Sequence, residues 1–124
     1  DHAGKDSYRH RQAGSNQVLI SSAKRSAHFI EHKPNTEPDL ADLLAQLVPA
    51  NLVLVEGFKS YPIEKIEIHR PSIGKPRIYL EDGLITAVAS DSPIADCPLP
   101  FFDLDDIIGI SAFILAQTKI KQVG

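Results

Sequence analysis

The sequence predicts an α/β fold with a mainly parallel sheet. Strand-like and helix-like segments alternate along the chain, as expected when helices connect parallel strands. In addition, residues 52–55 are continuously apolar (Leu-Val-Leu-Val), which is typical of a strand covered on both faces. With 124 residues, 43% of them apolar, the chain is long enough for one modest core. We therefore expect residues 1–124 to form a single domain.

The first elements are short. Asp6 is a good N-cap and Gly14 a good stop, so a short polar helix is predicted between them. Residues 18–20 are apolar and two of the three are β-branched, which indicates a strand. Residues 26–32 fit either a strand or a helical turn, and we favour the strand; Pro34 limits both.

The clearest amphipathic helix follows. Thr36 and Asp39 have capping-box spacing with Pro38 in the first turn, and the leucines and valine of residues 40–48 recur at helical spacing. After this helix, the apolar strand of residues 52–55 ends abruptly in Glu56-Gly57.

Three further strands are predicted near the middle of the chain. Ile66 and Ile68 alternate with polar residues, which indicates a strand with one wetter face. Residues 78–80 and 84–89 flank an Asp-Gly pair, which predicts a hairpin or another tight connection.

The last part of the chain begins with a loop that contains three prolines between residues 93 and 100. Asp103 then provides an N-cap for a final helix. Its apolar positions wrap widely around the axis, so we expect it to be mostly buried.

The composition excludes several function classes. The formal charge is −3 and no run of Lys or Arg occurs, which argues against binding to nucleic acid or anionic lipid. The longest apolar stretch, residues 107–116, falls well short of the ~20 residues that span a bilayer. A single cysteine, Cys97, and the lack of a leader pattern favour the cytoplasm.

Candidate site residues come directly after predicted strands, where open α/β sheets bind ligands. Glu56 and Gly57 follow one strand, and Ser90 and Asp91 end another. A carboxylate at such a strand tip suits Mg²⁺ held through water, and a glycine lets the backbone approach a phosphate. A turn or N-cap carboxylate explains Glu56 equally well on this evidence.

A second candidate lies around the first helix. Lys5, Asp6, Ser7 and Arg9 place cations and a hydroxyl near a helix N-terminus, an arrangement that attracts phosphate. A solvated polar helix explains the same residues more simply.

The chain contains no P-loop, which requires Gly, four residues and then Gly-Lys-Ser/Thr. Gly4-Lys5 is followed by Asp6, and Gly74-Lys75 by Pro76.

Two other patterns receive a simpler interpretation. His28, Glu31 and His32 match the H-x-x-E-H pattern of zinc peptidases, but that pattern requires a helix and this segment is better predicted as a strand. Surface histidines are the favoured interpretation. Cys97 has no neighbouring basic residue in sequence, so we expect an inert thiol without a role in the site.

Four segments taken together resemble the MobB family, the molybdopterin-guanine dinucleotide biosynthesis adaptor proteins. Their order and spacing match the family over nearly the whole chain. They are residues 1–14, 52–59, 65–70 and 87–91.

The resemblance implies a three-layer, P-loop NTPase-like sandwich. It also implies a cytoplasmic, homodimeric GTP-binding protein with at most weak GTPase activity. Such a protein assists the guanylyltransferase that converts Mo-molybdopterin to its guanine dinucleotide form, and apo-molybdoenzymes are further possible partners.

The resemblance also implies roles for single residues. Glu56, with Asp1, corresponds to the acidic residues near Mg²⁺, and Gly57 to the glycine near the γ-phosphate. Ser90 and Asp91 are expected near the guanine base. The family's signature segment faces the nucleotide or molybdopterin; here it supplies Lys5, Asp6, Ser7 and Arg9.

One family feature falls outside this sequence. The Walker A motif and the strand leading into it would lie upstream of Asp1, and the chain contains no Met. We expect the natural polypeptide to extend further at this end. If it does not, a non-enzymatic adaptor that docks the guanylyltransferase or an apo-molybdoenzyme, with nucleotide secondary, becomes the better hypothesis.

Overall fold

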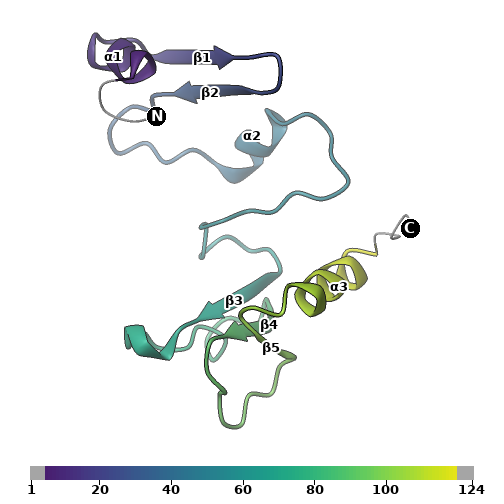
Figure 1. The fold of residues 1–124 in the computed structure, drawn as a ribbon. Coiled ribbons are helices and arrows are strands. Elements are labelled where there is room, and N and C mark those ends of the chain that lie inside the picture. Colours follow the sequence, from purple (N-terminus) through teal and green to yellow (C-terminus); the bar gives the residue numbers. More distant parts are fainter. Residues whose placement is uncertain (1–4, 120–124) are drawn as a thin grey trace. The chain divides into compact units, whose positions relative to one another are not determined.

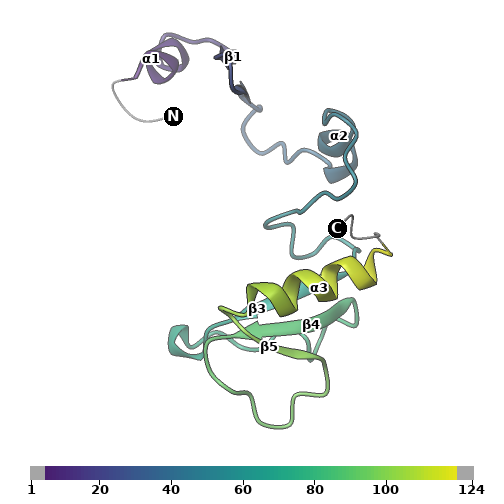
Figure 2. The same cartoon turned by 45° about the vertical axis from the view of Figure 1, so that its right-hand side comes forward.

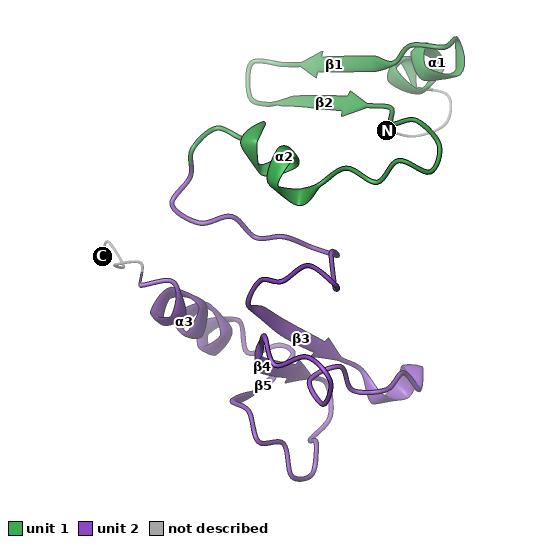
Figure 3. Ribbon diagram, turned by 180° about the vertical axis from the view of Figure 1, so that it is seen from behind, with its two compact units in different colours: residues 1–49 green, residues 50–124 purple. Residues whose placement is uncertain are grey.

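The computed structural model describes residues 5–119 of the chain (Figure 1). The chain divides into two compact units, residues 1–49 and 50–124, which Figure 3 distinguishes by colour. The single domain expected over residues 1–124 stays a prediction.

The first unit contains two helices and an antiparallel pair of strands. They are α1 (Asp6–Gln12), β1 (Gln17–Ser21), β2 (Ser26–Ile30) and α2 (Leu40–Ala45). β1 and β2 pair from Gln17 opposite Ile30 to Ser21 opposite Ser26. The predicted polar helix and both predicted strands, including the favoured strand over residues 26–32, are confirmed.

Helix α2 is shorter than its sequence pattern predicts. It begins at Leu40 after the extended residue Asp39, whose side chain makes no capping hydrogen bond, so the capping box expected at Thr36 does not form. Leu40 is buried, but Leu47 and Val48 are 54% and 84% exposed. Without a core to cover its last turn, the apolar pattern does not extend the helix.

The second unit is built on a three-stranded parallel sheet. Its elements are β3 (Lys65–His69), the 3₁₀ helix η1 (Pro71–Ile73), β4 (Ile85–Ser90), β5 (Phe101–Asp103) and α3 (Ile107–Gln117). The strand order is β3-β4-β5, and both pairs are parallel. The predicted α/β class with a parallel sheet is thereby confirmed.

The core of this unit lies on the central strand β4. Ile85, Ala87, Val88, Ala89 and Ser90 are all buried. Helix α3 covers one face of the sheet (Figure 2), where Phe113 contacts Phe102 of β5 with ring centroids 5.5 Å apart. A largely buried strand is expected where neighbouring strands pair on both sides.

The strand predicted over residues 52–55 does not form. In the part of the chain that the structure describes, no backbone hydrogen bond involves residues 52–56. Val53 and Leu54 are 43% and 74% exposed. A short apolar run becomes a strand only when a neighbour supplies the ladder hydrogen bonds, and β3 pairs here with β4 alone.

Residues 78–80 form a turn rather than a strand, so the connection to β4 is tight but is not a hairpin. The Asp-Gly turn is present, and its Asp82 side chain accepts a hydrogen bond from the Leu84 N–H at 2.9 Å. β5 was not predicted, because its three residues are too few to give a pattern.

Helix α3 also departs from its prediction. Its N-cap is Asp106, whose side chain accepts a hydrogen bond from Gly109 N–H at 3.0 Å, and Asp103 instead ends β5. None of its residues is buried, and Ile107 and Ile108 are 73% and 86% exposed. The helix packs one side on the sheet, so its wide apolar surface is largely uncovered in this unit. Among the described residues, no helix has the length and apolarity needed to cross a membrane.

Candidate functional site

The carboxyl ends of the three parallel strands form one row of polar residues. The strand register places His69 of β3 beside Ser90 of β4, and Ser90 beside Asp103 of β5. Asp91 continues from Ser90 beyond the sheet. This is the edge at which open α/β sheets bind their ligands. The structure thus places Ser90 and Asp91 at the predicted edge and adds His69 and Asp103, which sequence analysis missed.

Ser90 and Asp91 differ in their accessibility. Ser90 is 1% exposed, its Oγ accepts a hydrogen bond from Ser92 N–H at 3.2 Å, and its carbonyl accepts one from Leu104 N–H at 2.9 Å. Asp91 is exposed and accepts a hydrogen bond from the Ser92 hydroxyl at 3.3 Å. Ser90 therefore shapes the turn, while Asp91 offers a carboxylate to solvent.

Glu56 and Gly57 lie outside the sheet because residues 52–55 do not form a strand. Both are exposed, and Gly57 has φ +84° with no atom within 4 Å of the position that a Cβ would take. A left-handed backbone with open space beside it suits close approach of a ligand. The predicted placement of Glu56 at a strand tip is wrong for this unit, but its carboxylate is accessible.

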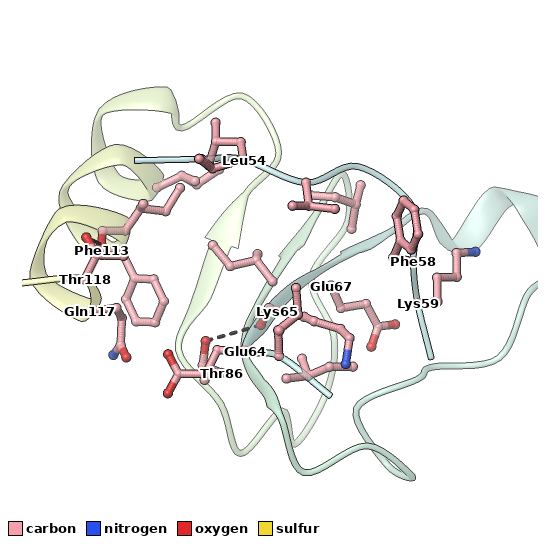
Figure 4. A pocket seen from close by; sticks show the side chains of 18 of the residues that line it. Leu54, Phe58, Lys59, Glu64, Lys65, Glu67, Thr86, Phe113, Gln117 and Thr118 are labelled. Atoms are coloured by element: carbon pink, nitrogen blue, oxygen red, sulfur yellow. Dashed lines mark hydrogen bonds between the residues drawn. The ribbon is translucent and has the colours of Figure 1, made fainter. Parts of the chain in front are cut away.

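An apolar groove of about 530 Å³ lies between this segment, the sheet and α3 (Figure 4). Leu54 and Phe58 line it from the segment, and Phe113 lines it from α3. Lys65 and Glu67 add charged groups from β3. Most of the side chains that line the groove are apolar. Gly57 is among the lining residues, and Glu56 is not.

The residues predicted around α1 lie in the first unit. Lys5, Asp6 and Ser7 line a shallow hollow together with residues of β1, and Ser7 is 8% exposed. Arg9 is exposed on α1 and does not line this hollow. Asp1, the second residue expected near Mg²⁺, lies outside the described residues.

A buried carboxylate on β3 is a further feature that sequence analysis missed. Glu67 accepts hydrogen bonds from the backbone N–H groups of Ile78 at 3.0 Å and Tyr79 at 2.7 Å, and its Oε2 lies 3.9 Å from Nδ1 of His69. Glu67 and His69 are 6% and 7% exposed, whereas Ile68 is 58% exposed.

The prediction that the polar side of β3 faces water is therefore wrong. The turn at residues 78–79 covers that side and satisfies the carboxylate, which makes its burial tolerable. The only signal in the sequence was a Glu and a His two residues apart on one strand face.

The zinc-peptidase pattern has no helical support. His28 is in strand β2, where its Nε2 lies 2.9 Å from Gln17 Oε1, and Glu31 forms an ion pair of 3.1 Å with Arg11. Across residues 5–119, no group of three or more His, Cys, Asp or Glu side chains is arranged to hold a metal. Cys97 is half-buried, with its Sγ 3.7 Å from the Leu99 carbonyl.

Comparisons with known proteins support the resemblance on which the site was predicted. The family model described as MobB, molybdopterin guanine dinucleotide synthesis protein B, matches residues 1–91. Two relatives are named molybdopterin-guanine dinucleotide biosynthesis adapter protein. The one from Escherichia coli K12 is 36% identical over 127 residues, which covers all of this chain and 71% of that protein. The one from Haemophilus influenzae is 38% identical over 117 residues, which covers 92% of this chain and 63% of that protein.

Proposed function

Because this chain belongs to the family of molybdopterin guanine dinucleotide synthesis protein B, we propose that it is a GTP-binding accessory protein of molybdenum cofactor biosynthesis. In this function it assists the conversion of Mo-molybdopterin to molybdopterin guanine dinucleotide. The family match over residues 1–91 is the observation that carries the proposal, since it includes both long segments of the resemblance. The chain spans about two thirds of the length of the two relatives.

The site residues selected from the sequence are suited to this role. Lys5 and Arg9 supply cations for phosphate oxygens, with Asp6 and Ser7 beside them. Gly57 allows close approach of the backbone, and Ser90 and Asp91 lie at the sheet edge expected near the base. The first four residues belong to the first unit and the other three to the second, and the role of each is part of the proposal.

The proposal includes Mg²⁺, with Glu56 as the residue that binds the ion or its coordinated water. Its carboxylate is exposed and, among the described residues, has no ion pair or hydrogen bond, so it is available to a hard cation or to the water around one. When bound, Mg²⁺ would neutralise charge on the nucleotide phosphates. Any GTPase activity is expected to be weak.

We further propose that the protein acts as a cytoplasmic homodimer whose protein partners are the guanylyltransferase and apo-molybdoenzymes. The word adapter in the relatives' names supports a function through protein partners. A purely non-enzymatic adaptor, with nucleotide secondary, is the second candidate.

A titration separates the two candidates. With the full-length chain, we expect GTP to bind more tightly in the presence of Mg²⁺. We expect Glu56→Ala to weaken this Mg²⁺-dependent binding of GTP about tenfold. Glu81→Ala is the matched control, because Glu81 is also exposed in the second unit but lies outside the proposed site. Equal GTP affinity for both variants contradicts the role of Glu56, and no GTP binding by the full-length chain favours the adaptor.

A further inference from the structure

Residues 70–77 form a positively charged loop directly after β3. The loop contains Arg70, Lys75 and Arg77 and no acidic residue, although the chain as a whole carries a formal charge of −3. All its residues are exposed. Within the described part of the chain, none of the three cationic side chains has an ion pair or hydrogen bond. The loop therefore presents three uncompensated positive charges to solvent.

The buried carboxylate of Glu67 binds the backbone directly after this loop. Arg70 follows the last residue of β3, and Arg77 precedes Ile78, whose N–H is bonded to Glu67 on the same strand at 3.0 Å. Arg70 is thus fixed by the carboxyl end of β3, and Arg77 lies one residue before a backbone group bonded to the middle of that strand, with η1 (Pro71–Ile73) between them (Figure 1). Pro71 further restricts the backbone between them.

Nearby acids do not neutralise the loop. Both carboxylate oxygens of Glu67 accept backbone hydrogen bonds, and its side chain is 3% exposed. Asp82 is bonded to Lys65 at 3.0 Å. His69 is buried and faces Glu67. Asp103 ends β5 and Asp91 follows β4 at the same edge of the sheet, and among the described residues neither forms an ion pair with the loop. Like charges held in one loop repel one another, so an anion bound among them would be stabilised.

We propose that the loop of residues 70–77 is a binding site for a phosphate- or diphosphate-bearing ligand. Arginine provides two parallel donors that match phosphate oxygens, and lysine adds a flexible point charge. The loop emerges at the carboxyl edge of the sheet, where α/β proteins hold ligands. The biological identity of the ligand rests on the proposed function, because a dinucleotide and its precursors carry such groups.

Inorganic pyrophosphate is the probe for this site, titrated calorimetrically into the full chain at low salt. We expect Arg70→Gln and Arg77→Gln each to weaken binding about fivefold, and the double variant about twentyfold or more. Arg25→Gln is the matched control, because Arg25 is an exposed cation in the first unit; it should stay within about twofold. Circular dichroism and the thermal midpoint should be unchanged in all variants, since every substituted side chain is exposed.

Other variants distinguish this proposal from the proposed function. If pyrophosphate affinity falls in Lys5→Gln but not in the two arginine variants, phosphate binds near α1 and the loop proposal is overturned. No saturable binding, or equal affinity for wild type and the arginine double variant, overturns it as well. The GTP titration with Glu56→Ala uses a different ligand and a different variant. A negative result for the loop therefore does not change the conclusion about GTP binding.

Discussion

Replacing Glu67 by Gln tests whether a single buried carboxylate holds the turn at residues 78–79 against the sheet. In the wild type, the Glu67 carboxylate accepts N–H groups at 3.0 and 2.7 Å and is nearly inaccessible to water. Glutamine keeps one acceptor oxygen but places an amide donor opposite the second N–H. One hydrogen bond thus loses its charge assistance, and the other is lost.

The expected destabilisation follows from these two bonds. Hydrogen bonds to charged groups contribute about 1.5–3 kcal/mol each, and neutral ones about 1 kcal/mol. The turn at Ile78 is partly exposed, so we expect water to enter it in the variant and to reduce the loss. We therefore expect Glu67→Gln to lower the free energy of unfolding by about 2 kcal/mol.

Urea denaturation measures this change as a shift of the midpoint at constant slope. Hydrogen exchange should show faster exchange of the Ile78 and Tyr79 amides in the variant, which reports the local effect directly. Glu64→Gln is the control, because Glu64 is an exposed carboxylate just before the same strand; it should change stability by less than about 0.5 kcal/mol. If Glu67→Gln behaves like Glu64→Gln in both measurements, the carboxylate does not hold the turn.

Two further predictions concern the second unit. Hydrogen bonds from the Leu84 N–H and then from the Lys65 ammonium hold the pKa of Asp82 below its ordinary value. The ionised Asp82 carboxylate therefore contributes to stability above about pH 4, and this contribution is lost as the pH falls through the lowered pKa. Asp82→Asn should therefore flatten the acid limb of stability in urea midpoints between pH 7 and 3, and an unchanged limb would show that this pairing is unimportant. Phe113→Ala should lower the free energy of unfolding by about 2 kcal/mol, less than for a fully buried ring, because Phe113 is half-buried against Phe102; a thermal midpoint equal to that of wild type would mean that α3 is not anchored there.

Local patterns located most elements because they act over a few residues. The β-branched runs marked β1 and β4, and the polar residues between Asp6 and Gly14 marked α1. The predicted N-cap was wrong by one position, because the N-cap of α1 is Lys5 and Asp6 is already helical. Helix α2 and residues 52–55 were overpredicted for a shared reason: both patterns require a packed neighbour, and the described parts of each unit do not supply it. β5 was missed because its short segment is held by pairing with β4 and not by its own pattern.

The residues of the candidate site also fall into those that the sequence could select and those that it could not. Residues in motifs, such as Lys5, Glu56, Gly57 and Asp91, could be selected from the sequence because residue type and spacing identify a family. Their roles toward a nucleotide stay predictions. Glu67 could not be selected, since a carboxylate on an alternating strand is usually solvated.

By itself, the sequence determined the family and the α/β class, since both depend on residue order and on patterns within short segments. Only the tertiary structure decided which face of β3 is buried and where its neighbouring loop closes. That decision depends on Ile78 and Tyr79, which are distant from Glu67 in sequence and donate to it only once the chain has folded back. A buried polar group is stable only with such partners, and no property of the strand alone supplies them.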